Sequence, residues 1–113
     1  MINTRVWPLI TAAMVIVIST ACAGLALHAA ADPKLIARGE QVYADYCSNC
    51  HGEGLVNTSG GVTFDLRRLR AEDRDRFLTS VLDGKRQMPP WRGALEMDQI
   101  EAIWAYVRAT VDR

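Results

Sequence analysis

The sequence holds few of the side chains from which a metal centre is built. Its 113 residues include three cysteines, Cys22, Cys47 and Cys50, and two histidines, His28 and His51. A structural zinc site takes four ligands, commonly two pairs of cysteine or histidine separated by a loop. Because Cys22 and His28 lie in an apolar N-terminal stretch, the second pair is missing, which argues against a zinc-stabilised domain.

The chain also lacks an excess of either charge. It carries 13 Lys and Arg against 13 Asp and Glu, and residues 32–113 carry 12 against 13. Domains that bind nucleic acid usually show a strongly basic face, so this balance argues against nucleic acid as a partner. The arginines between Arg67 and Arg76 alternate with acidic residues, which is typical of a solvated helix face; a docking patch is the alternative.

The first 31 residues contain a single charged residue, Arg5. A basic start, a long apolar run and the ending Ala29-Ala30-Ala31 predict a secretory signal peptide over residues 1–31, followed by one domain over residues 32–113. The apolar run approaches the roughly 20 residues that span a bilayer, so an uncleaved N-terminal membrane anchor is the alternative. In both cases the sequence predicts a protein exported to the periplasm.

The run Cys47-Ser48-Asn49-Cys50-His51 has the Cys-x-x-Cys-His pattern of covalent c-type haem attachment. Two cysteines three positions apart on a helical turn direct their sulfurs to one side, where each thiol adds to a vinyl group of the same porphyrin. His51 continues the turn and would bring its imidazole beneath the ring as an axial iron ligand. We therefore predict one covalent haem c bound through Cys47 and Cys50.

Two other interpretations of this run stay open. A redox-active pair of the thioredoxin type would follow a strand in an alternating pattern of strands and helices, whereas the segments here have helical periodicity. A plain disulfide between Cys47 and Cys50 suits an oxidising compartment, but it gives His51 no role.

Three segments have the apolar spacing of helices. They span residues 33–50, 70–83 and 97–110, with a turn-rich loop over residues 52–61. Gly39 lies inside the first helix, although glycine there costs about 1 kcal/mol relative to alanine. We therefore expect another helix to approach closely at Gly39, with the bulk of Trp104 and Tyr106 set against it.

The segment before the last helix is predicted to supply a second iron ligand. Residues 85–91 contain two prolines and cannot be helical throughout, and a stiff extended loop is suited to hold the Met88 thioether against iron. Met1 and Met14 lie in the N-terminal stretch, and Met97 begins a helix where we expect it to pack. Met88 as an adaptable core residue is the alternative.

Together these residues resemble a class I cytochrome c. The likeness rests on Gly39 and Tyr43 before the Cys-x-x-Cys-His run, on Met88-Pro89 after it, and on Trp104-Ala105-Tyr106 in the last helix. It spans residues 33–110. It implies an all-α small cytochrome c fold, with three to four helices around one covalently attached haem.

On the family's pattern His51 and Met88 are the axial iron ligands, and Cys47 and Cys50 attach the porphyrin. The chain departs from this pattern after Gly52, where it lacks the proline that many class I members place on the histidine side. The hydrogen-bond partner of His51 is therefore not assigned. If Met88 does not bind iron, a haem-based ligand sensor or weak peroxidase is the alternative function.

Three stretches, 63–67, 88–91 and 103–106, are similar to small periplasmic cytochromes that accept electrons from quinoprotein alcohol dehydrogenases. This likeness implies a monomeric one-electron carrier of a respiratory chain and not an enzyme, because an iron with two protein ligands has no open position for a substrate. Its partners would be a donor dehydrogenase and, as acceptor, a terminal oxidase or another cytochrome. Only an uncleaved leader would link it to a membrane.

The exported product is expected to begin at Asp32 and to carry one haem bound through Cys47 and Cys50. The intact mass of protein from a host that matures c-type cytochromes reports both modifications at once. Replacing both cysteines by alanine should remove the haem mass and leave leader cleavage unchanged. A colourless wild-type product with both thiols open to alkylation would contradict the haem assignment.

Overall fold

The computed structural model of the chain describes residues 31–113. Apart from Ala31, the predicted signal peptide lies outside the described residues. The helices are α1 (Pro33–Tyr46), α2 (Ser48–His51), α3 (Arg74–Asp83) and α4 (Met97–Val111), with single 3-10 turns at Glu53–Leu55, Leu66–Arg68 and Ala71–Asp73. Over residues 31–113 the only β-type pairing is two isolated bridges, so the all-α prediction is confirmed. In this range no helix combines the length and the apolar character that crossing a bilayer requires.

The first helix begins as predicted but ends early. The Asp32 carboxylate accepts a hydrogen bond from the Lys34 amide at 2.9 Å and caps α1. The predicted helix over 33–50 is interrupted at Cys47, where φ is −117° and ψ is −32°. The Tyr43 hydroxyl donates to the Gly52 carbonyl at 2.6 Å, a contact that a straight helix rising 1.5 Å per residue would not allow. The haem-motif turn therefore folds back against α1 as a separate helix, α2.

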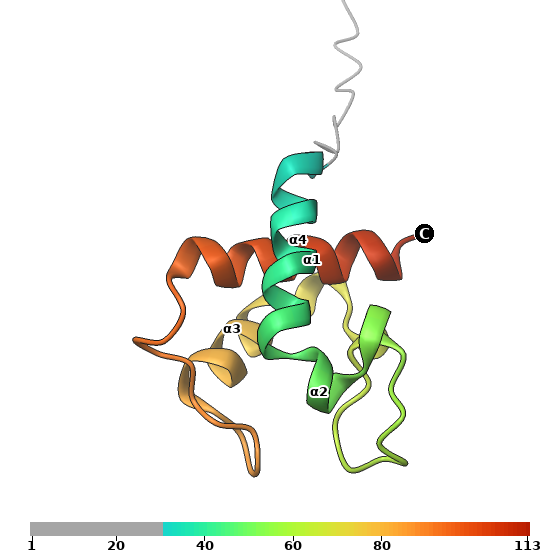
Figure 1. Cartoon of the computed structure of the whole chain (residues 1–113), viewed down its shortest axis with the longest axis vertical. Coiled ribbons are helices and arrows are strands. Elements are labelled where there is room, and N and C mark those ends of the chain that lie inside the picture. The colour runs from blue at the N-terminus through green and yellow to red at the C-terminus, as the bar shows by residue number, and fades with distance from the viewer. Residues whose placement is uncertain (1–30) are drawn as a thin grey trace, which may run out of the picture.

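The crossing of α1 and α4 is the closest helix contact in the fold (Figure 1). A Cβ added to Gly39 would lie 1.8 Å from the Ala102 carbonyl oxygen, so only glycine fits there. The predicted close approach is confirmed, but the predicted partners are wrong. Tyr106 instead packs on Tyr43, with ring centroids 5.4 Å apart, and Trp104 packs on Phe77 at 5.1 Å.

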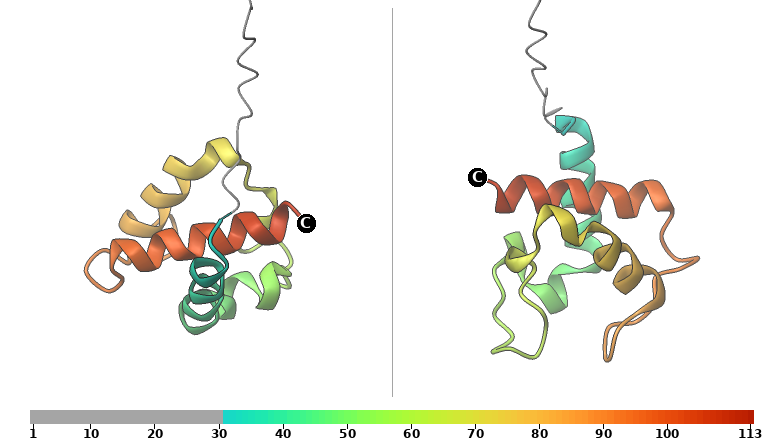
Figure 2. Two further views of the ribbon diagram at one scale, coloured as in Figure 1. Left: turned by 90° about the horizontal axis from the view of Figure 1, so that it is seen from above. Right: turned by 180° about the vertical axis from the view of Figure 1, so that it is seen from behind.

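The core lies around α4, which runs between α1 and α3 when seen from above (Figure 2). Ile100, Ile103 and Val107 of α4 are almost wholly inaccessible to solvent, as predicted from their helical spacing. The buried cluster comprises Val42, Tyr43, Leu55, Leu69, Phe77, Val81, Leu95, Ile100, Ile103, Trp104, Tyr106 and Val107. Burial of this apolar surface is the main favourable term in folding.

Two details of the later helices differ from the sequence predictions. The third helix begins at Arg74 and not at Arg70, because the Asp73 carboxylate accepts from the Arg70 amide at 2.8 Å and closes a 3-10 turn first. It ends at Gly84 as predicted. Met97 starts α4 as predicted, but it is 47% exposed, so the packing expected of its side chain is at most partial.

Substituting Gly39 by alanine should destabilise the fold by about 2 kcal/mol or more. Alanine gains helix propensity, but its methyl group would overlap the α4 backbone and force the two helices apart. Chemical denaturation of the holoprotein measures the loss in free energy of unfolding. The control Ala37→Val adds volume at an exposed position of α1 and should cost less than about 1 kcal/mol. Equal losses for both variants would contradict the close-contact explanation.

Candidate haem site

The two motif cysteines lie at the start and end of one short turn. Cys47 links α1 to α2 and is half-buried, whereas Cys50 is exposed in α2. Burial, with a smaller contribution from Cys50, raises the pKa of the Cys47 thiol to about 11. A redox-active pair needs a thiol of lowered pKa, so this environment disfavours the thioredoxin-type interpretation. Neither thiol forms a disulfide within residues 31–113.

The imidazole of His51 is oriented by a backbone carbonyl. Its Nδ1 lies 3.0 Å from the carbonyl oxygen of Phe64. Because a carbonyl only accepts hydrogen bonds, Nδ1 carries the proton and Nε2 keeps the lone pair that a metal requires. In metal-binding histidines, a hydrogen bond from the nitrogen that does not bind the metal fixes the tautomer and the ring orientation. Although the chain lacks the family's proline on this side, His51 Nδ1 still has a hydrogen-bond acceptor, because the Phe64 carbonyl provides it.

Gly52 allows the chain to turn immediately after His51. Its φ is +88°, and a Cβ there would lie 1.8 Å from the Val56 carbonyl oxygen. The Tyr43 hydroxyl donates a hydrogen bond to the Gly52 carbonyl. Burial raises the pKa of Tyr43 well above its usual range, so the hydroxyl keeps its proton and remains a donor. This contact ties the end of α2 to the buried face of α1.

The segment that carries Met88 is held by backbone hydrogen bonds. Lys85 and Met88 exchange two of them, at 3.0 and 3.1 Å, and the Trp91 amide donates to the Val81 carbonyl of α3 at 2.9 Å. A Cβ on Gly84 would lie 2.6 Å from the Met88 carbonyl oxygen, so the segment packs tightly on the end of α3. Met88 itself is half-buried against the core. These contacts therefore fix the backbone of Met88.

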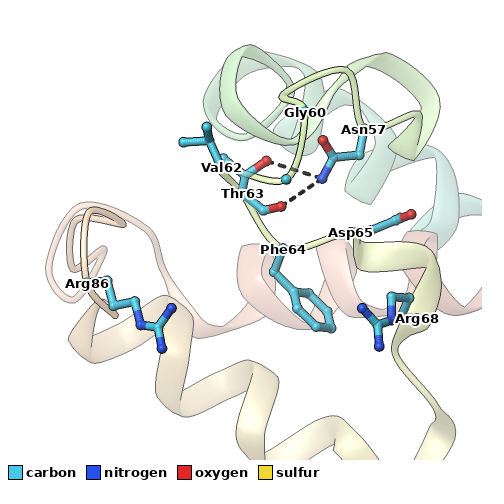
Figure 3. A pocket seen from close by; sticks show the side chains of 9 residues that line it. Asn57, Gly60, Val62, Thr63, Phe64, Asp65, Arg68 and Arg86 are labelled. Atoms are coloured by element: carbon cyan, nitrogen blue, oxygen red, sulfur yellow. Dashed lines mark hydrogen bonds between the residues drawn. The ribbon is translucent and has the colours of Figure 1, made fainter.

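The histidine and methionine segments project from the same side of α4, as the front and rear views show (Figures 1 and 2). A cavity of about 450 Å³ lies between residues 57–68 and Arg86, within the range of about 300–1,000 Å³ that is usual for cofactor sites. Arg68 and Arg86 approach it from opposite sides, with the Phe64 ring between them (Figure 3). Cys47, Cys50, His51 and Met88 do not line this cavity, but Phe64 and Arg86 link it to the histidine and methionine segments.

The sequence placed Arg68 only in a possible docking patch and did not single out Arg86. Arg86 has φ of +56°, a left-handed conformation that glycine adopts without strain. Among residues 31–113 neither arginine forms an ion pair, so both keep their positive charge available to an anionic group at the cavity. The signal that the sequence offered was weak, because both lie among many other arginines.

Most of the remaining arginines between 67 and 76 are paired. Arg67 binds Asp65 at 2.8 Å, Arg70 contacts Glu72 at 3.1 Å, and Arg74 pairs with Glu101. These exposed pairs contribute little to stability. They match the prediction of a solvated helix face and leave little net positive charge for a docking patch.

The donor set fits a haem and not a bare metal ion. No group of three or more His, Cys, Asp or Glu side chains within residues 31–113 is placed to hold a metal. The two thiols of the Cys-x-x-Cys-His run and its adjoining imidazole are instead groups that suit attachment of haem c, and Met88 adds a thioether on a fixed backbone.

Comparison with known proteins agrees with this assignment. Residues 34–107 match the family model described as cytochrome C oxidase, cbb3-type, subunit III. The chain is 36% identical over 80 residues to quinohemoprotein alcohol dehydrogenase ADH IIB of Pseudomonas putida, which covers 68% of this chain but 11% of that protein. It is 32% identical over 74 residues to cytochrome c6 of Leptolyngbya boryana, which covers 63% of this chain and 87% of that protein. No solved structure matches the chain.

The chain therefore spans about a tenth of the dehydrogenase and most of the cytochrome c6. The matched region contains the haem motif, Met88 and all four helices except the end of α4 and the first residue of α1. The chain accordingly belongs to the cytochrome c family, as a class I monohaem member whose cofactor is covalently bound haem c.

Proposed function

We propose that this cytochrome is a periplasmic one-electron carrier, and not an enzyme, whose haem iron is bound by His51 and Met88. It belongs to a family of electron carriers. Haem c supplies the one-electron couple between ferric and ferrous iron. The observation that carries the proposal is the hydrogen bond from His51 Nδ1 to the Phe64 carbonyl, because it holds Nε2 ready for the metal.

The Met88 segment supports a second protein ligand. The two backbone hydrogen bonds between Lys85 and Met88, and the packing of Gly84 against the Met88 carbonyl, fix the backbone from which the thioether extends. A thioether ligand favours ferrous iron and raises the reduction potential. Two protein ligands exclude substrates from the metal, which suits transfer of electrons and not oxygen chemistry.

The first helix is compatible with export and cleavage after Ala31. Asp32 caps α1, so a chain cleaved there would keep the N-cap of this helix. In this proposal residues 1–31 are the signal peptide and residues 32–113 the haem domain. An uncleaved leader would instead hold the same domain at the membrane surface.

The likeness to quinohemoprotein alcohol dehydrogenase ADH IIB supports a quinoprotein dehydrogenase as electron donor. The acceptor in this proposal is a terminal oxidase or another cytochrome. Partners of this kind form small and short-lived interfaces, so a monomer with an exposed loop surface is sufficient. Val62 is 75% exposed and Phe64 is 43% exposed, and both lie on the loop beside the cavity.

Replacing Met88 by alanine should open one axial position. The ferrous variant is expected to bind carbon monoxide readily, and its reduction potential should fall by on the order of 0.1 V within the roughly 0.8 V range that axial ligands span. Optical titration with carbon monoxide measures the first effect. Met97→Ala is the matched control, because Met97 is exposed and should change neither property. Equally ready binding by the wild type would favour the sensor or peroxidase alternative.

The reduced full-length protein should be reoxidised by a respiring membrane fraction from a bacterium that expresses it. The decay of the ferrous absorption band follows the reaction, and heat-treated membranes provide the control. Addition of a quinoprotein alcohol dehydrogenase with its alcohol should reduce the protein again. Absence of reoxidation by every membrane fraction tested would refute the carrier role.

A further inference from the structure

The loop on the histidine side is held by a cluster of side-chain hydrogen bonds, which we name the Asn57–Ser59–Thr63 clasp. Asn57 Nδ2 donates to the Thr63 carbonyl at 2.9 Å, as drawn in Figure 3. The Ser59 amide and hydroxyl donate to Asn57 Oδ1 at 2.9 and 2.7 Å. The Thr63 amide donates to Ser59 Oγ at 3.0 Å. Three side chains thus close the loop into a ring.

The Thr63 hydroxyl connects the clasp to the haem-motif turn. Its Oγ1 lies 2.8 Å from the Cys50 carbonyl oxygen and 2.9 Å from Ser59 Oγ, and it has one proton to donate. Carbonyls in the last turn of a helix have no partner within the helix, so Cys50 offers an acceptor without a competing donor. The Cys50 carbonyl oxygen is also the nearer of the two acceptors, so we assign the Thr63 proton to it.

Phe64, the next residue, connects the clasp to His51. Its carbonyl oxygen accepts from His51 Nδ1 at 3.0 Å. The Thr63–Phe64 dipeptide is consequently bound at two points of the same turn, the Cys50 carbonyl and the His51 ring. Any movement of Thr63 shifts the Phe64 carbonyl against the imidazole.

Between residues 57 and 63 little else holds the loop in place. Gly60 and Gly61 have positive φ and no neighbouring atoms within 4 Å of an added Cβ, and Val62 is largely exposed. Apolar contacts hold the chain only on either side of this stretch, at Leu55 and Leu66. Within residues 57–63 the clasp is therefore the main restraint on the chain that leads to the Phe64 carbonyl.

We propose that Asn57, Ser59 and Thr63 are positioning residues for the axial imidazole, which hold the Phe64 carbonyl against His51 Nδ1. The clasp takes the place of the proline that this chain lacks. This inference rests on the proposed function, since it takes His51 as an iron ligand. A firmly held acceptor makes the imidazole a stronger donor to iron and favours the ferric state. Loosening the clasp should therefore raise the reduction potential.

The test is a redox titration of holoprotein carrying Thr63→Val, which removes the hydroxyl and keeps the shape. At a fixed ambient potential the ratio of ferrous to ferric protein should rise about threefold, equal to about 28 mV at 59 mV per tenfold change. Proton NMR of the oxidised protein should show shifted His51 ring resonances. The second variant, Ser59→Ala, removes one hydroxyl with little change in volume and should move both readings in the same direction if Thr63→Val does not mature.

Two control variants separate positioning from packing. Thr63→Ser keeps the hydroxyl and should restore the wild-type potential and spectrum. Thr58→Val makes the same chemical change at an exposed residue of the same loop that forms no side-chain hydrogen bond within residues 31–113, and should leave both readings unchanged.

Wild-type potentials in both hydroxyl-free variants would overturn the inference and leave the proposed function standing. A shift in Thr63→Ser as large as that in Thr63→Val would also overturn it, because the methyl group would then be responsible. If the wild type lacks the spectrum of a histidine and methionine pair, the proposed function fails together with the inference.

Discussion

The backbone contact between α1 and α4 sets the course of the helix that leads into the haem motif. Gly39 lets α1 lie directly against the Ala102 carbonyl, closer than any side chain would permit. From this crossing α1 continues for about two turns and ends at Cys47. The Tyr43 to Gly52 hydrogen bond then folds α2 back beside that helix. The crossing and this hydrogen bond together place the haem motif.

The two segments that face each other below α4 are fixed by different means. On the histidine side, polar side chains and one carbonyl hold a glycine-rich loop that is mostly exposed, and Thr63 joins that loop to Cys50. On the methionine side, two prolines and backbone hydrogen bonds to α3 hold a segment that packs on the core. The difference follows from burial: residues 57–63 contain no buried side chain and are held by hydrogen bonds, whereas Met88 and Trp91 pack against the buried cluster.

The sequence predicted the long helices and the haem c cofactor, because periodicity and the Cys-x-x-Cys-His spacing are local signals. It did not predict the break at Cys47, which depends on a contact between Tyr43 and a backbone carbonyl nine residues later. It correctly required a close helix at Gly39 but assigned the wrong partners, since periodicity identifies a helix face and not the residue at a crossing. The hydrogen-bond acceptor for His51 could not be predicted for a related reason. Every residue has a backbone carbonyl, so nothing in the sequence distinguishes Phe64 as the acceptor.

The histidine and methionine segments leave their helices through glycines at which any Cβ would clash with the backbone. A Cβ at Gly52 or Gly84 would overlap a carbonyl oxygen of the same segment, whereas Gly54 and Gly60 have open space around them and would incur only the conformational cost of positive φ. Substitutions are therefore tolerated unevenly along these two segments. Gly52 and Gly84 are fixed, whereas positions with open space such as Gly54 and Gly60 can vary in sequence, so the exposed surface can change there without rebuilding the scaffold.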